Sequence, residues 1–390
     1  MRRFICIFSA FTLLLAGCVK NEPLTSGGQE TKAEIAFESP IVAPKTKSLQ
    51  QVLNYPSNLN FKVCGFYSQG YGPIIDGASI LNKYIDGAEF GRSGNVWAGL
   101  DKPYYWFPSA YLHFVAYAPS RLSGSLLSST VTAEGLQLNG YTVPDEANED
   151  LMVSQIAYKR SKPAIAGEGS PLVFDHALTS ILFQVKSGVY GDRTSADPDR
   201  IDTDLRIVKI EVVDARASGD FSQQMTSWNN EQMNSPAAAQ NPEKGWTVAD
   251  NAAVKTFVAY EGEQMLTDSY QLIHDLPSAA SGYSLTNLIL LPQEIKDNVK
   301  LKVTYDMTHS NLSSINGQEN LWLEDEVVEI PMNQCGITEW LRGYRYVYNL
   351  TLSLGKIQCS IEALPWDEYE TLEYVDGMIH DLNEREFTLK

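Results

Sequence analysis

The sequence has few of the residues that enzymes use for metal binding and nucleophilic catalysis. Its 390 residues include only 5 His and 5 Cys. They contain no Cys-x-x-Cys pair and no His-Glu-x-x-His motif, so no zinc site can be recognised. A Gly-x-Ser-x-Gly elbow and a glycine-rich phosphate loop are missing too. We therefore expect a protein that is not an enzyme, with no catalytic residues, no metal and no cofactor.

Basic residues are scarce relative to acidic ones. Lys and Arg number 30 against 48 Asp and Glu, which gives a net charge of −18. Such a chain repels phosphate backbones, so we exclude nucleic acid as a partner. Hydrophobic residues make up 44% and charged residues 20%. This is a globular composition, and the length allows two domains of ordinary size.

Long apolar runs are missing except at the N-terminus. Arg2 and Arg3 precede an apolar stretch from Phe4 to Leu15, which is too short to span a membrane and is typical of an export signal. The following Ala-Gly-Cys18 resembles the lipobox of bacterial lipoproteins. We predict that residues 1–17 are a lipoprotein signal peptide and that Cys18 is acylated; the alternative is a buried cysteine after a plain signal peptide.

The next residues, 18–32, are polar and contain Gly, Ser and Pro. This composition predicts a flexible tether. Beyond it the cysteines are Cys64, Cys335 and Cys359. Three is an odd number, and their spacing matches no metal motif. We expect buried free thiols in strands, with a Cys335–Cys359 disulfide as the alternative in an oxidising compartment.

Strand signals dominate the body of the chain. Apolar residues alternate with polar ones from Val299 to Met307 and again from Tyr346 to Leu354, which indicates strands with one buried face. Asn139-Gly140 and Asn316-Gly317 are typical of hairpin turns. The sequence therefore predicts an all-β protein with strands spaced as in β-sandwiches.

A shift in composition suggests where the body divides. The stretch from Ala217 to Trp246 is rich in Gln, Asn, Ser, Pro and Ala and nearly lacks β-branched residues. We place a boundary there, between an N-terminal β-domain at 33–225 and a C-terminal β-domain at 226–366. A tail follows at 367–390.

Several residues suggest ligand binding but have simpler structural interpretations. An acidic cluster comprises Asp197, Asp199, Asp202 and Asp204. It lacks the central Gly and terminal Glu of an EF-hand, which favours a solvated loop. An aromatic cluster comprises Tyr104, Tyr105 and Trp106. It could stack on sugars, but alternation places its first and last members on one face, where core packing is expected. His113 and His176 are interpreted as structural histidines.

A series of motifs extends over nearly the whole chain. They are Thr46-Lys47-Ser48, Tyr105-Trp106, the aromatic run from Tyr111 to Pro119, Asp150 to Val153, Val173 to Ile181, Tyr346 to Leu352, and Pro365-Trp366. The most specific are His176-Ala177-Leu178 and Ala116-Tyr117-Ala118-Pro119. In this order they resemble the fimbrillin-like family, the type V pilins of Gram-negative gut and oral anaerobes.

The resemblance implies two transthyretin-like β-sandwich domains in tandem. It also implies a structural subunit of a cell-surface fimbrium, exported as an outer-membrane lipoprotein on acylated Cys18 and contributing to adhesion. In the family, a trypsin-like protease removes the N-terminal segment with its first strand, and a strand from a neighbouring subunit fills the groove. The implied partners are other pilin subunits, the outer membrane and a host or bacterial surface receptor.

The family roles transfer to particular residues of this chain. The candidate displaced strand comprises Glu34, Ile35, Ala36 and Phe37. The family usually has a maturation arginine, but no Arg lies between Arg3 and Arg92, so the nearest basic candidates are Lys45 and Lys47. The tail has a candidate donor strand with Tyr369, Leu372, Tyr374 and Val375; the alternative is a disordered acidic tail.

Two other functions stay open. The first is a surface-anchored lipoprotein that binds glycans through exposed aromatic residues. The second is a surface hydrolase, although the sequence gives no basis for choosing a catalytic pair among its 48 acidic residues.

Overall fold

The computed structural model describes most of the chain after residue 31. The described residues are 32–38, 40–42, 53–68, 82–107, 111–132, 135–154, 157–160, 169–189, 201–223, 245–273, 288–311, 321–353, 356–366 and 385–388. Contacts divide the chain into a unit Met1–Lys32 and a unit Ala33–Lys390, and the fold given below is that of the second unit.

The predicted all-β fold is confirmed. The described residues form β-strands and one 3-10 helix, η3 (Met332–Cys335). Among these residues the structure contains no helix with the length and apolarity needed to cross a bilayer.

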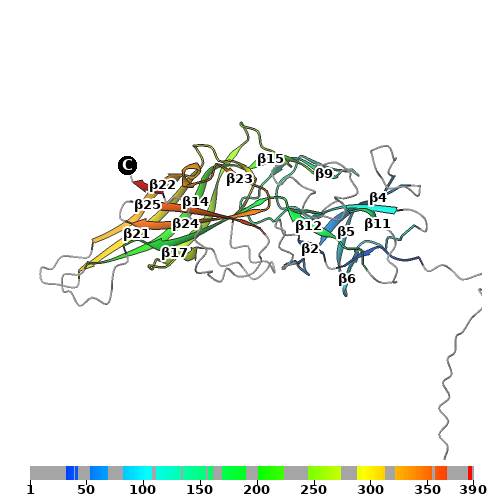
Figure 1. Ribbon diagram of the computed structural model, residues 1–390, viewed down its shortest axis with the longest axis horizontal. Helices are drawn as coiled ribbons and strands as arrows, with labels where there is room; N and C mark the ends of the chain where they lie inside the picture. Colours follow the sequence, from blue (N-terminus) through cyan, green and yellow to red (C-terminus); the bar gives the residue numbers. More distant parts are fainter. Residues whose placement is uncertain are drawn as a thin grey trace, which may run out of the picture. The chain divides into compact units, whose positions relative to one another are not determined.

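The first sheet is built from the N-terminal part of this unit (Figure 1). In sheet order its strands are β1 (Ala36–Phe37), β6 (Val96–Gly99), β5 (Asn82–Ser93), β4 (Phe61–Ser68), β7 (Tyr111–Ala118), β10 (Met152–Ser154), β12 (Val173–His176), β2 (Ile41–Val42) and β3 (Leu53–Asn54), with β11 (Ala157–Arg160) also on β7. One face covers a core rich in aromatic residues, including Phe61, Phe90, Phe114 and Phe174.

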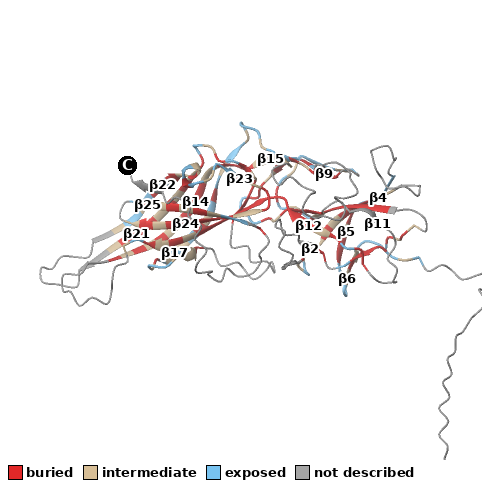
Figure 2. Ribbon diagram, in the orientation of Figure 1, coloured by how far each residue is buried: buried red, intermediate tan, exposed pale blue. Residues whose placement is uncertain are grey.

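Two further sheets enclose a second core (Figures 1 and 2). One has the order β17 (Val254–Met265), β14 (Ile201–Arg216), β21 (Lys300–Asn311) and β22 (Leu321–Pro331). The other has the order β18 (Gln271–Ile273), β13 (Thr179–Ser187), β24 (Tyr344–Ser353), β25 (Lys356–Pro365) and β26 (Arg385–Thr388), with β19 (Leu288–Leu290) also on β13. Apolar residues of both sheets, such as Ile207 and Leu350, meet in this core, so the pair forms a sandwich.

Smaller sheets complete the fold. One has the order β16 (Trp246–Thr247), β15 (Ser218–Ser222), β9 (Gly135–Thr142) and β8 (Ser128–Thr132), and the other pairs β20 (Gln293–Glu294) with β23 (Glu339–Trp340). The second core includes residues on both sides of the predicted domain boundary, for example Leu138 and Leu350. The boundary at 225–226 itself lies outside the described residues. It stays a prediction, as does the tandem transthyretin-like architecture.

The alternating patterns predicted the strands well. Val299, Leu301, Val303, Tyr305 and Met307 are all buried along β21 and the residue before it. The hairpin predicted at Asn139-Gly140 is wrong, because both residues lie inside β9. Gly140 has a φ of 61°, its N–H donates to Asp220 Oδ1 at 2.7 Å, and the register to β15 shifts there, so the pair forms a bulge. Asn316-Gly317 lies outside the described residues, between the paired strands β21 and β22.

Candidate strand-exchange site

The predicted displaced strand is the first strand in the order of the first sheet. Ala36 and Phe37 form β1 and pair antiparallel with Ala98 and Trp97 of β6. Before them, Glu34 bridges Tyr105. The segment is therefore held by main-chain pairing, which a strand of another sequence could reproduce.

Hydrogen bonds reach this segment from both sides. On one side Ile35 N donates to Tyr104 O at 2.7 Å, and Trp106 N donates to Ala33 O at 2.9 Å. On the other side Glu38 N donates to Ser170 O at 3.0 Å, and Ser170 N donates to Ala36 O at 2.8 Å. β1 therefore lies between β6 and the chain that leads into β12. Its removal would expose unpaired backbone groups on both flanks.

Phe37 is central to the aromatic core of the first sheet. Its side chain is fully buried, and its ring centroid lies 5.1 Å from that of Phe114, 5.3 Å from Phe90 and 5.9 Å from Phe61. All three contacts are edge-to-face, the favourable geometry for aromatic pairs. Ile35 is also fully buried. Loss of the segment would thus open an apolar groove, with a pocket lined by aromatic rings at the place that Phe37 had filled.

The backbone of β1 is packed unusually closely against residues 169–170. A Cβ placed on Gly169 would overlap the backbone of Phe37 and Glu38, well inside van der Waals contact. Only a glycine at 169 allows the two chains to lie so close together. This contact joins residues far apart in sequence, and no local pattern could have predicted it.

A second short strand follows β1 and was missed by sequence reasoning. Ile41 and Val42 form β2, which pairs parallel with β12 and antiparallel with β3. Two residues are too few to show an alternating pattern, so this strand had no signal. The candidate cleavage sites Lys45 and Lys47, and the candidate lipid-bearing Cys18, lie outside the described residues. A cut at either lysine would separate both β1 and β2 from the remaining strands.

The C-terminal candidate is described only in part. Tyr369, Leu372, Tyr374 and Val375 lie outside the described residues. Farther on, Arg385–Thr388 form β26 and pair antiparallel with β25, with Phe387 opposite Ile357 and Arg385 opposite Cys359. The end of the chain therefore contains a strand at the edge of the second sandwich sheet.

The aromatic and histidine candidates serve the core. Tyr104 and Trp106 are buried, as the alternation predicted, while Tyr105 is half-buried. Burial and the hydrogen bond from the Tyr104 hydroxyl to Asp101 Oδ2 raise the pKa of Tyr104 to about 12. His113 and His176 are both buried, in β7 and at the end of β12. The glycan-binding alternative needs exposed aromatic side chains. Because Tyr104 and Trp106 pack in the core, the predicted cluster does not provide them.

The acidic cluster differs from its prediction. Asp202 and Asp204 lie in β14, paired opposite Ser310 and Thr308 of β21, so the loop interpretation is wrong for them. Leu205 and Ile207, farther along the same strand, are fully buried in the second core. Asp197 and Asp199 lie outside the described residues. No group of three potential metal ligands occurs among the residues that the structure describes.

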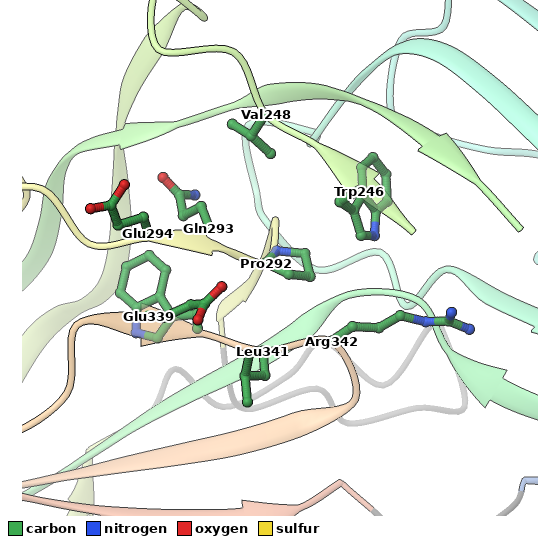
Figure 3. A pocket seen from close by; sticks show the side chains of 9 residues that line it. Trp246, Val248, Pro292, Gln293, Glu294, Glu339, Leu341 and Arg342 are labelled. Carbon is green, nitrogen blue, oxygen red and sulfur yellow. The ribbon is translucent and has the colours of Figure 1, made fainter. Parts of the chain in front are cut away.

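A small cavity of about 150 Å³ lies beside β16, β20 and β23 (Figure 3). Its polar side chains are largely engaged in structural hydrogen bonds. Gln293 bonds the backbone of Arg216 and Leu291, and Trp340 Nε1 donates to Tyr348 Oη at 2.9 Å. Arg342 Nε donates to His176 O at 3.0 Å. These bonds fix the walls of the cavity and converge on no common point within it.

Comparison with known proteins points to one family. The sequence profile of the family described as fimbrillin-like matches residues 60–366. Among solved structures, a fimbrial protein from Bacteroides vulgatus is 14% identical with a TM-score of 0.52, and the match covers 86% of this chain and 99% of that protein. A candidate cell adhesion protein from Bacteroides uniformis is 14% identical with a TM-score of 0.44, covering 86% of this chain and 99% of that one. No curated protein matches the chain.

Proposed function

Since the chain belongs to the fimbrillin-like family, we propose that it is a structural subunit of a cell-surface fimbrium and assembles by exchange of its first strand. It works through strand pairing and has no catalytic step. Cell adhesion is the consequence of the fibre that it forms with other pilin subunits.

The observation that carries the proposal is the position of β1. This strand of two residues supplies the aromatic core with a fully buried Phe37, yet it is held by backbone hydrogen bonds on both flanks. A strand from a second subunit can satisfy the same backbone groups, and an apolar side chain can refill the pocket. Because one molecule gives a strand and accepts another elsewhere, the contact is head-to-tail and propagates as a fibre.

The route to the surface follows from the N-terminal sequence. The predicted lipoprotein signal peptide at residues 1–17 directs export, and acylation of Cys18 anchors the precursor to the outer membrane. Cleavage at Lys45 or Lys47 then releases the segment that includes β1 and β2. The donor is the C-terminal tail, through the segment that contains Tyr369, Leu372, Tyr374 and Val375.

Limited trypsin treatment of the purified precursor tests this proposal. Treated protein, incubated and run without boiling in SDS, is expected to give a ladder of multimers, because donated strands dissociate slowly. Mass spectrometry should place the new N-terminus after Lys45 or Lys47. A variant with Lys45→Gln and Lys47→Gln is the matched control and should remain uncut there and monomeric.

A peptide covering residues 33–40 provides a competition test. Added in excess during incubation, it should occupy the vacated groove and suppress the ladder, whereas a peptide of the same composition in scrambled order should not. If the treated protein loses β1 but remains monomeric without any peptide, strand exchange is not its mode of assembly.

A further inference from the structure

Two of the three cysteines downstream of Cys18 meet in the second core. Cys335 and Cys359 are both buried, with exposed fractions of 2% and 0%. Their thiols form a side-chain hydrogen bond with each other, and both lie close enough to Tyr348 to affect its ionisation. In the structure both are free thiols. The helix η3 packs against β25, so the two hydrogen-bonded thiols lie together within a closed core, an arrangement from which a disulfide can form.

Cys335 lies in the helix that follows one sheet of the sandwich, and Cys359 lies in a strand of the other sheet. Cys335 is the last residue of η3, which directly follows β22, and Met332 N of this helix donates to Val299 O at 3.0 Å. Cys359 lies in the middle of β25, on the inward face with Ile357 and Ile361. A bond between them would join the β17-β14-β21-β22 sheet to the sheet that contains β25.

Cys64 provides an internal comparison. It is also buried, in β4, but its Sγ accepts a hydrogen bond from Gly87 N at 3.1 Å. Neither of the other two cysteines contributes to the environment of Cys64. The Cys64 thiol is therefore buried like those of Cys335 and Cys359, but among the described residues it has no second thiol as its hydrogen-bond partner.

We propose that Cys335 and Cys359 form a disulfide when the chain folds under oxidising conditions. In the exchange, one thiolate attacks a disulfide oxidant and releases one oxidant thiol. The second thiolate then attacks this mixed disulfide and releases the other. Two cysteine thiols are oxidised and one oxidant disulfide is reduced, and the two protons that the cysteines lose end on the two released oxidant thiols.

The bond forms before the core closes. Burial raises the pKa of the Cys359 thiol well above its ordinary value, which disfavours the reactive thiolate in the folded chain. An oxidant must therefore reach these residues while the sandwich is still open. Once formed, the disulfide ties β25 to the opposite sheet, so the strand that pairs with β26 stays fixed when the subunit is under load.

The occurrence of the bond in the cell rests on the export that the proposed function requires, so the test has two arms. In the first, the full chain is refolded with oxidised glutathione; in the second, it is purified from an exporting host. Each sample is denatured in an alkylating agent and analysed by peptide mass spectrometry. We expect a linked pair of peptides, lighter by two hydrogens, that contains Cys335 and Cys359, with Cys64 fully alkylated.

Variants separate the bond from general effects on folding. Cys64→Ser should retain the linked peptides and the fall in Tm that reductant causes in the parent chain. Cys335→Ser should lose both and leave Cys359 open to alkylation. Full alkylation of Cys335 and Cys359 after oxidative refolding, or a link from either to Cys64, overturns the proposal without any variant. Linkage on refolding with full alkylation after expression in the exporting host would instead contradict export.

Discussion

The imidazole of His176 stacks on the indole of Trp366, with ring centroids 4.0 Å apart and planes inclined by 5°. His176 ends β12 in the first sheet, and Trp366 directly follows β25, which belongs to one sheet of the sandwich around the second core. His176 Nδ1 also lies 2.9 Å from Asp150 Oδ1, and Trp366 N donates to Gly343 O at 3.0 Å. The stacked pair therefore joins strands of two different sheets through buried side chains.

Trp366→Ala is expected to destabilise the protein by about 3–5 kcal/mol, because it removes a fully buried ring and leaves a cavity against His176. Urea unfolding followed by circular dichroism measures the loss. Leu364→Ala is the control, since this nearby side chain is 38% exposed and should change stability by less than about 1 kcal/mol. Equal effects of the two substitutions would show that the stacked pair has no special role.

Phe37→Ala should weaken the first core by about 3–5 kcal/mol, since the ring is lost from the centre of three edge-to-face contacts. The fluorescence of Trp97 and Trp106, which line the same core, would report its unfolding. Glu38→Ala, at an exposed neighbouring position, should leave stability nearly unchanged. If Phe37→Ala has no more effect than Glu38→Ala, β1 does not contribute to the core as the structure indicates.

Gly169→Ala should loosen β1 specifically, because the added methyl group overlaps the backbone of Phe37 and Glu38. Hydrogen exchange should become faster at Ile35 N and Glu38 N, which donate to Tyr104 O and Ser170 O. Exchange in β24 should not change. The control is Gly94→Ala, where a Cβ meets nothing within 4 Å and the cost is the strain of a positive φ, about 1 kcal/mol. Unchanged exchange at both amides would contradict the close packing.

Glu211 should make stability depend on pH in the acid range. Burial acts to raise its pKa, but hydrogen bonds from Lys209 and Lys302 outweigh this and hold the pKa below the usual glutamate value. A depressed carboxyl pKa stabilises the fold at pH above the unfolded value and loses this contribution as pH falls through the folded value. The free energy of unfolding should therefore fall less steeply with pH in the Glu211→Gln variant than in the parent chain. Urea unfolding measured from about pH 7 to about pH 3 gives this dependence.

Glu261→Gln is the matched control for this effect. Its side chain is 68% exposed and lies 3.8 Å from the same Lys209 Nζ, so its removal should leave the acid decline largely intact. If the free energy of unfolding of the Glu211→Gln variant falls as steeply with pH as that of the parent chain, the acid sensitivity comes from other carboxyl groups.

Local patterns explain how much of this structure could be predicted from the sequence. Apolar and polar residues alternate from Val299 to Met307 along most of β21, and that pattern alone identified which apolar side chains are buried. Asn139-Gly140 failed because a positive φ at glycine suits a bulge as well as a turn, and pairing with β15 decided between them.

The candidate site depends on contacts that no local pattern contains. Phe37 was expected in a first strand, but its position follows from its pairing with Trp97 and Ser170, which lie 60 and 133 positions farther along the chain. His176 and Trp366 were each part of a recognised motif, yet their stacking appears only in the folded chain. Strands as short as β2 have too few residues to show any period.

The parallel pairing of β13 with β24 has a consequence for how the chain folds. Ser180 to Ser187 align with Arg345 to Leu352, and Thr179 hydrogen-bonds Tyr344 across 165 residues of sequence. The central pair of this sheet therefore cannot form until almost the whole polypeptide is available. During synthesis or export, β13 stays unpaired, with its apolar face uncovered, until β24 is available. This delay slows folding and exposes the nascent chain to aggregation.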